Sequence, residues 1–193
     1  MIRVPHRNDL LMFIPFGAVC AEVGVFTGLF SEKILEIVRP SMLYLIDSWS
    51  TEYKLKWYVD TPEGWQQQEM TGAEAYGVAC DRFASHFTTK MLRGKSVDML
   101  LTLPDCSLDM VYVDADHSRQ AVMFDLEASL TKMRAGGWIM GHDYCSVFPG
   151  VVSAVDQFCS DYGLSIDVLT DESPPDVPGG AGVAFNSYGI RVT

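Results

Sequence analysis

The chain has 193 residues, of which 48% are hydrophobic and 20% charged, a composition typical of one ordered globular domain. Its formal net charge of −11 disfavours binding to nucleic acid, because affinity for phosphates comes largely from Lys and Arg. No apolar run approaches the ~18 residues of a transmembrane helix, so we expect no membrane partner. The five cysteines form no C-x-x-C pair, which fits a reducing, cytoplasmic location.

Short apolar runs alternate along the chain with amphipathic stretches, which is the pattern of βαβ units. The expected strands are residues 18–23, 42–46, 91–93, 110–113, 138–141, 165–169 and 182–185. The expected helices are residues 29–38, 72–86, 119–133 and 151–162. The sequence therefore predicts a single α/β domain over residues 1–193, with a mostly parallel seven-stranded sheet and an antiparallel last strand.

Two segments interrupt this alternation. Residues 48–70 are polar and aromatic, with Trp49, Trp57 and Trp65, and loops of this length are more often functional than idle. We expect a substrate lid or insertion, although the rings could equally pack over the sheet edge or against a second copy in a homodimer. Residues 171–182 are rich in Pro and Gly and are expected to form a flexible connection to the last strand.

The first strand runs into a glycine turn that precedes a helix. The turn contains Glu22, Gly24 and Gly28, and such turns bring backbone N–H groups close to a ligand. A dinucleotide site of the form G-x-G-x-x-G would require glycine where Phe26 and Leu29 stand. The turn therefore argues against an NAD-linked oxidoreductase on the same fold.

An acidic residue, Asp47, ends the second strand 23 residues after Gly24. This offset is close to the ~20 residues at which a carboxylate can accept hydrogen bonds from ribose hydroxyls. Asp47 could instead cap a helix or loop, but its position favours a nucleoside-containing cofactor.

Ionisable side chains follow the fourth and fifth predicted strands directly. Asp114, Asp116 and His117 come after the fourth strand, and His142 and Asp143 come after the fifth. Charged groups are buried only when they are paired or bind a ligand, so packing alone does not explain this clustering. Because ligands bind at the carboxyl ends of parallel strands, we expect a functional site here.

Taken together, these motifs resemble those of class I S-adenosylmethionine-dependent methyltransferases. The E-x-G-x-x-x-G turn resembles their motif I, and D-x-D-H-S followed by H-D-Y is similar to small members related to metal-dependent sugar O-methyltransferases. The resemblance implies a three-layer Rossmann-like methyltransferase fold and S-adenosylmethionine as cofactor. It implies the cofactor-binding residues Glu22, Gly24, Gly28, Asp47, Ser96 and Asp114. Ser96 would lie beside the adenine, although a serine there could equally cap the helix that follows.

The same resemblance implies a metal site. In the relatives, an aspartate after the fourth strand and two acidic groups after the fifth hold Mg²⁺, and Asp114 and Asp143 match two of these three. His142 stands where an acidic ligand is usual, and imidazole suits transition metals better than Mg²⁺. We expect Asp114 and Asp143, together with His142 or with Asp116, to hold Mg²⁺, Mn²⁺ or another transition ion, or the cluster to work without metal.

Methyl transfer to oxygen requires a group that accepts the proton of the acceptor. The relatives carry a histidine at the position of His117, so the resemblance implies His117 as the base, with Asp116 as the alternative. The predicted function is O-methylation of a small hydroxylated molecule such as a sugar or phenol, with N-methylation left open. The alternatives are a non-catalytic S-adenosylmethionine-binding domain and, as noted, an NAD-linked oxidoreductase.

Overall fold

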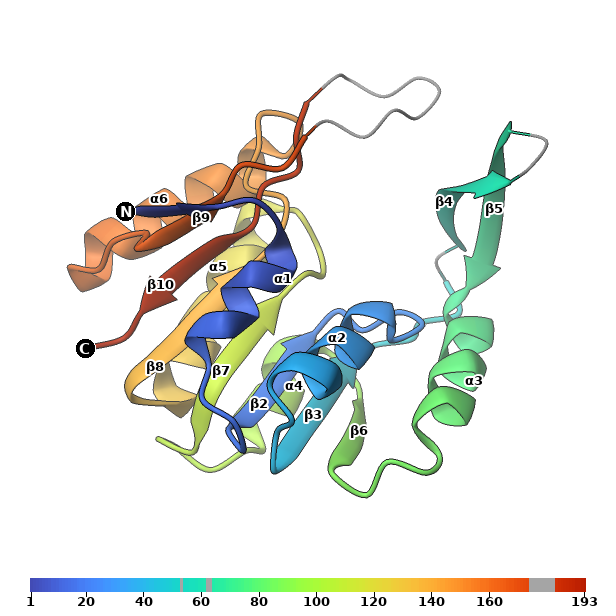
Figure 1. Ribbon diagram of the computed structural model, residues 1–193, viewed down its shortest axis with the longest axis horizontal. Helices are drawn as coiled ribbons and strands as arrows, with labels where there is room; N and C mark the ends of the chain where they lie inside the picture. Colours follow the sequence, from blue (N-terminus) through green and yellow to red (C-terminus); the bar gives the residue numbers. More distant parts are fainter. Residues whose placement is uncertain (53, 62–63, 174–182) are drawn as a thin grey trace.

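The computed structural model describes residues 1–52, 54–61, 64–173 and 183–193. Its centre is an eight-stranded sheet with the order β1-β9-β10-β8-β7-β2-β3-β6 (Figure 1). The strands are β1 (Ile2–Val4), β2 (Val19–Val23), β3 (Met42–Asp47), β6 (Thr89–Arg93), β7 (Leu108–Val113), β8 (Met133–Gly141), β9 (Val168–Thr170) and β10 (Tyr188–Arg191). Strand β10 is antiparallel to both of its neighbours, and the other pairs are parallel. The predicted mostly parallel sheet with an antiparallel last strand is confirmed.

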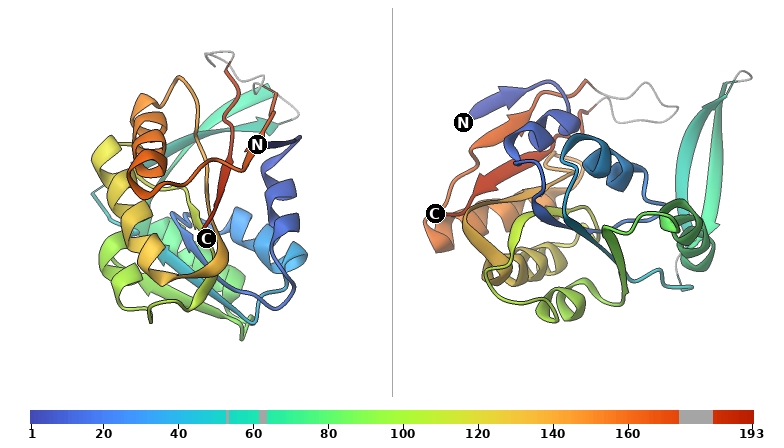
Figure 2. Two further views of the ribbon diagram at one scale, coloured as in Figure 1. Left: turned by 90° about the vertical axis from the view of Figure 1, so that its left-hand side faces the viewer. Right: turned by 60° about the horizontal axis from the view of Figure 1, so that its bottom comes forward.

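Helices cover both faces of the sheet and give three layers (Figure 2). One face carries α1 (Arg7–Leu10), the 3-10 helix η1 (Leu11–Phe13), α2 (Leu29–Ile37) and α3 (Gly72–Phe83). The other face carries α4 (Ser96–Leu101), α5 (Arg119–Lys132) and α6 (Pro149–Tyr162). All four expected helices are present, with ends that differ by less than about one turn.

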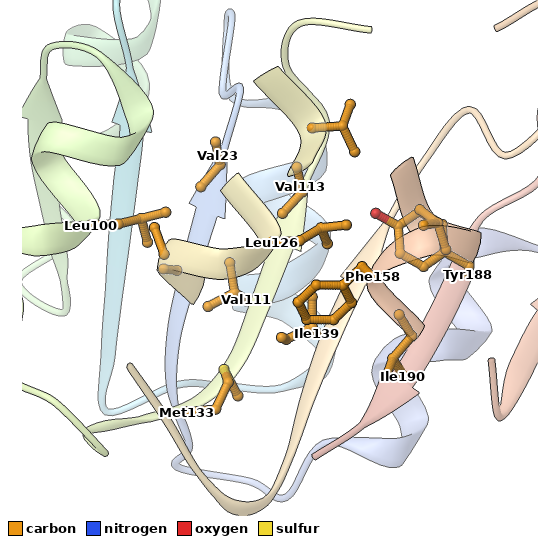
Figure 3. Packing of buried hydrophobic residues seen from close by; sticks show 14 of the residues in the cluster. Val23, Leu100, Val111, Val113, Leu126, Met133, Ile139, Phe158, Tyr188 and Ile190 are labelled. Carbon is orange, nitrogen blue, oxygen red and sulfur yellow. The ribbon is translucent and has the colours of Figure 1, made fainter. Parts of the chain in front are cut away.

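The alternation of side chains along each strand divides the core into two clusters. In β7, Met110 and Tyr112 pack toward α1 and α2, whereas Val111 and Val113 pack toward α5 and α6. Figure 3 shows the second cluster, in which Phe158 of α6 lies against the strands. Burying one large apolar side chain stabilises a fold by roughly 1.5–3 kcal/mol. Because β7 buries apolar side chains on both faces of the sheet, it contributes to both core clusters.

Two strand predictions are wrong. The sheet has eight strands rather than seven, because Ile2–Val4 forms a parallel edge strand on β9. The last strand is not residues 182–185: residues 183–185 have no strand structure, Gly182 lies outside the described residues, and Tyr188–Arg191 pairs with β8 instead. The three residues of β1 are too few to show the alternation of a strand. Strand β10 forms by pairing with β8, which is distant in the sequence. In the predicted connection 171–182, residues 174–182 lie outside the described part of the chain.

The segment 48–70 is not a loop. It contains a β-hairpin of β4 (Lys54–Thr61) and β5 (Gly64–Thr71), which stands apart from the main sheet next to α3 (Figures 1 and 2). Trp49 precedes the hairpin and is buried in the core, so it does not belong to a lid. A lid role for the hairpin stays a prediction.

The order of the strands fixes where a ligand can bind. After β2 the chain adds β3 and β6 on one side, then crosses to β7 and β8 on the other. In an open α/β sheet this reversal opens a crevice at the carboxyl ends of the two strands involved, here β2 and β7. The glycine turn after β2 and the aspartates after β7 therefore meet there.

Among the described residues, no helix has both the length and the apolar character needed to cross a membrane.

Outside this crevice, one acidic side chain of α5 is buried among apolar residues. Asp125 is 2% exposed, and within the described chain its Oδ1 atom and the hydroxyl of Ser129 have no hydrogen-bond partner. Burial raises the pKa of Asp125 to about 6, although Ser96 lies beside the carboxylate and acts to lower it. The folded protein therefore binds the Asp125 proton more tightly than the unfolded chain does, and ionisation destabilises the fold above this pKa.

We predict that Asp125→Asn stabilises the protein more at high pH than at low pH. The cost of ionising Asp125 is absent below about pH 4, grows up to about pH 6 and is constant above it. The free energy of unfolding should rise by about 3 kcal/mol at pH 8 and by about half of that at pH 5. Urea denaturation at pH 5 and at pH 8 measures the free energy of unfolding. Asp81→Asn at an exposed position is the control. A gain that does not depend on pH would contradict the prediction.

Candidate active site

Two glycines shape the turn after β2. Gly24 has φ +90°, and a Cβ atom there would lie 1.8 Å from the carbonyl oxygen of Asp114. Gly28 has φ +84° and forms the N-cap of α2, where a Cβ would meet the ring of Phe83 at 2.4 Å. Only glycine fits both the backbone angle and the space at either position.

The carboxylate of Asp47 organises this turn. Its Oδ2 accepts a hydrogen bond from the backbone N–H of Phe26 (2.8 Å), and its Oδ1 accepts one from Trp49 (2.8 Å). The indole Nε1 of Trp49 donates to the carbonyl of Phe26 (2.8 Å). Asp47 thus lies beside the glycine turn as predicted, and its role toward ribose hydroxyls stays a prediction.

Glu22 lies beneath the turn and is only 2% exposed. The hydroxyl of Ser31 on α2 donates a hydrogen bond to its carboxylate. Burial raises the pKa of Glu22 to about 8, and the negative charge of nearby Asp114 acts in the same direction. The side chain therefore supports the start of α2 and holds a proton at neutral pH in the protein without ligands.

Backbone hydrogen bonds hold the ends of three strands together. The N–H of Asp114 donates to Val23 (2.8 Å), and the N–H of His142 donates to Val113 (3.1 Å). Side chains that follow β7 and β8 therefore leave the sheet side by side. They line a small pocket whose apolar wall includes Tyr188.

The centre of this pocket is Asp143, a buried aspartate with φ +60°. His117 Nε2 donates to its Oδ2 (2.9 Å), and His142 Nδ1 donates to its Oδ1 (3.1 Å). His142 Nδ1 also lies 3.9 Å from Oδ2 of Asp114. The structure thus brings all five ionisable residues predicted here to one pocket. Phe148 packs on the His117 ring with centroids 4.1 Å apart.

The pKa values in this cluster follow from these contacts. Burial opposes ionisation of Asp143, but the hydrogen bonds from both histidines outweigh it and hold the pKa of Asp143 below its usual range. The bond to Asp143 raises the pKa of His117 above 6.5. Burial acts to lower the pKa of His142, yet Asp143 and Asp114 raise it overall. For Asp114 itself, burial is dominant and raises the pKa.

Two further predicted site residues have their polar partners outside the cluster around Asp143, although Asp116 lines the same pocket. The Oδ1 of Asp116 accepts from the backbone N–H of Ser118 (2.6 Å) just before α5, and this bond lowers the pKa of Asp116. Ser96 is the first residue of α4 and lies beside Asp125. The N-cap of α4 is Lys95, so Ser96 does not cap the helix. A contact of Ser96 with adenine stays a prediction.

Three side chains are arranged so that they could hold a metal ion. One ligand atom each from Asp114, His117 and Asp143 lies within 4.8 Å of the others. The expected set contained His142 in place of His117, and sequence order alone could not choose between them. Two carboxylates and one imidazole suit a transition ion better than Mg²⁺.

A comparison of sequences now decides the family. Residues 21–144 match a family described as a methyltransferase domain, and this match covers more than half of the chain, including the glycine turn and the cluster around Asp143. The chain belongs to this family. It is a class I S-adenosylmethionine-dependent methyltransferase with a Rossmann-like fold. No protein of curated function matches the sequence significantly.

Solved structures resemble this methyltransferase in fold. N-methyltransferase NodS from Bradyrhizobium japonicum WM9, in complex with S-adenosyl-L-homocysteine, is 12% identical with a TM-score of 0.63, covering 96% of this chain and 85% of that one. Precorrin-6y C5,15-methyltransferase from Geobacter metallireducens GS-15 is 12% identical, with a TM-score of 0.60 and coverage of 95% and 84%. An rRNA methylase from Streptococcus thermophilus is 9% identical, with a TM-score of 0.62 and coverage of 96% and 94%. At these identities the likeness concerns the fold alone.

Sequence reasoning missed three residues of the methyltransferase site. They are Trp49, which closes the glycine turn, Phe148, which packs on His117, and Arg7, which lies 3.7 Å from Asp114. Phe148 and Arg7 come from segments distant in sequence from His117 and Asp114, and an isolated Arg or Phe carries no local pattern that would mark it. Trp49 was noted in the segment 48–70, but its bonds to Asp47 and to the glycine turn were not expected.

We predict that Gly24→Ala disrupts the methyltransferase, because its Cβ would overlap the backbone of Asp114. The free energy of unfolding should fall by about 3 kcal/mol or more, since backbone cannot yield as a flexible side chain can. Gly77→Ala is the matched control, because nothing lies within 4 Å of a Cβ there, and alanine should stabilise α3 by about 0.5–1 kcal/mol. Thermal and urea unfolding compare the variants; equal stability of the two would contradict the structure.

We also predict that Asp143→Asn lowers the pKa of His117, because the carboxylate that stabilises the imidazolium is lost. NMR titration of the imidazole resonances with a chelator present measures the change. Asp156→Asn removes a carboxylate that accepts from Tyr144 instead and is the control. An unchanged pKa in Asp143→Asn would show that the two side chains do not form this bond.

Proposed function

We propose that this methyltransferase transfers the methyl group of S-adenosylmethionine to a hydroxyl oxygen of a small molecule, with His117 as the base. The hydrogen bond of 2.9 Å between His117 and Asp143 carries this proposal. It lies at the carboxyl ends of β7 and β8, next to the glycine turn expected to hold the cofactor. A methyl donor and a proton acceptor would therefore meet at one edge of the sheet.

The local geometry supports the role of His117. Its Nε2–H donates to Asp143, which assigns the tautomer and leaves Nδ1 to accept a proton from the acceptor. The ring is held between Asp143 and Phe148, while 38% of the side chain is exposed to an incoming molecule. Because Asp143 raises the pKa of His117, the imidazole is a stronger base near neutral pH.

Asp116 is a weaker candidate for the base. Its carboxylate already accepts from Ser118, and its pKa is lowered. A group that binds protons weakly accepts one from a hydroxyl poorly. Asp116 then has the local role of shaping the chain just before α5.

A metal-assisted reaction is the second candidate, favoured by the proximity of Asp114, His117 and Asp143. These three residues would hold a divalent ion such as Mn²⁺, and the bound ion would supply acidification of the acceptor hydroxyl. His117 would then be a ligand, and the proton would need another acceptor, for which the structure offers His142 beside Asp143.

The charge of the chain supports a small acceptor. Similar folds include an rRNA methylase and a precorrin methyltransferase, so the fold does not choose between these classes. A net charge of −11 opposes binding of a phosphate backbone, whereas sugars and phenols carry no such charge. We propose a single domain located in the cytoplasm, with the β4–β5 hairpin as a lid or as a contact between two copies.

We predict that the purified protein binds S-adenosylmethionine with micromolar affinity and does not bind NAD. Isothermal calorimetry in the presence of a chelator, and again with Mg²⁺ or Mn²⁺, tests this. A heat signal with NAD and none with S-adenosylmethionine would remove the cofactor assignment.

We further predict that His117→Ala lowers turnover by about 100-fold or more, because general bases typically contribute that much. Asp143→Ala should have a comparable effect, since it leaves the imidazole without its partner. Transfer of labelled methyl groups to a panel of sugars and phenols measures turnover, and calorimetry verifies that cofactor binding remains. The exposed His86→Ala is the control. Full turnover in both site variants would overturn the assignment, and loss of activity with chelator in the wild type would favour the metal-assisted candidate.

A further inference from the structure

Arg7 of helix α1 reaches the cofactor side of the sheet from outside the segment that matches the family. The matched residues are 21–144, whereas Arg7 belongs to the preceding segment. Its guanidinium lies over the ring of Phe30, 4.7 Å from the centroid, and one of its nitrogens is 3.7 Å from Oδ2 of Asp114. The N-terminal segment thus contributes a positive charge to an otherwise acidic site.

Among the described residues, the N–H groups of this guanidinium have no hydrogen-bond acceptor. A separation of 3.7 Å is too long for a hydrogen bond, and within the described part of the chain the Arg7 side chain makes none. The backbone N–H of Arg7 donates to Glu172 (3.0 Å), which fixes the position of α1. With 35% of its side chain exposed, Arg7 can receive a ligand without moving away from Phe30.

The cofactor has one group that the acidic residues of the site cannot bind. S-adenosylmethionine carries a sulfonium and an ammonium, which are positive, and one carboxylate, which is negative. Asp47 and Asp114 suit the positive groups and the ribose hydroxyls, but their carboxylates repel a carboxylate. A guanidinium binds a carboxylate through two parallel hydrogen bonds, so Arg7 has the chemistry that is missing.

The place of Arg7 fits that task. Phe30, over which it lies, belongs to the first turn of α2, directly after Gly28 of the glycine turn. The free backbone N–H groups at the start of this helix also favour a negative charge. Asp114, the other neighbour of Arg7, follows β7 at the switch point of the sheet. The amino-acid end of the cofactor would therefore lie between the turn, Asp114 and Arg7.

We propose that Arg7 binds the α-carboxylate of S-adenosylmethionine, so that the N-terminal helix α1 forms part of the cofactor site. This inference rests on the cofactor assignment made above. It concerns a residue outside the segment that matches the family.

The test compares two ligands that differ in the amino-acid group. S-adenosylhomocysteine has the carboxylate, and 5′-methylthioadenosine lacks the whole amino-acid portion. By calorimetry, Arg7→Ala and Arg7→Gln should weaken binding of S-adenosylhomocysteine by roughly 10–100-fold, the range expected for a charge-assisted pair. Binding of 5′-methylthioadenosine should change less than about twofold, and Arg7→Lys should lie between wild type and Arg7→Ala.

Arg39→Ala is the matched control, because Arg39 also lies over a phenylalanine ring, that of Phe16, but does not contact the residues of the site described here. It should bind both ligands as the wild type does. An equal loss of affinity for both ligands in Arg7→Ala would assign Arg7 a purely structural role and overturn the proposal, as would unchanged binding of S-adenosylhomocysteine. A wild-type protein that binds neither ligand would instead overturn the cofactor assignment.

Discussion

The contact between Gly24 and the backbone of Asp114 is the constraint on which the rest of the site depends. A Cβ at position 24 would lie 1.8 Å from the carbonyl oxygen of Asp114, so the turn after β2 and the residues after β7 can approach only through glycine. The hydrogen bond from Asp114 to Val23 joins the same two strands. The backbone alone therefore sets the distance between the glycine turn and the cluster around Asp143.

The charges of the site are balanced around Asp143. Its two oxygens accept hydrogen bonds from His117 and His142, which keeps it ionised although it is buried. The same bonds act to raise the pKa of both histidines. At the other side of the crevice, the guanidinium of Arg7 lies 3.7 Å from the carboxylate of Asp114. The described residues at this edge of the sheet therefore include both carboxylates and positive side chains.

The sequence by itself determined the fold class and the place of the site. Apolar strands alternating with amphipathic helices predict an α/β sheet because the two periods differ, and the resemblance of the glycine turn and the D-x-D-H and H-D-Y motifs gave the methyltransferase family. Glu22, Gly24, Asp47 and Asp143 could be placed because each lies at or just after the end of a predicted strand, and parallel strands end at a common edge. These are local patterns, readable in a few consecutive residues.

Only the tertiary structure decided the pairing of distant segments. Strand β1 and the true position of β10 depend on hydrogen bonds to β9 and β8. The hairpin was missed because β5 is mostly polar, although Leu55, Trp57 and Val59 stand at alternate positions in β4. The grouping of His117 with Asp114 and Asp143, and the position of Arg7 of the N-terminal segment beside Asp114, are likewise set by distances in space. The periodic pattern of apolar residues shows which face of a helix or strand is buried. It carries no information on which side chain from a distant segment will lie beside a given site residue.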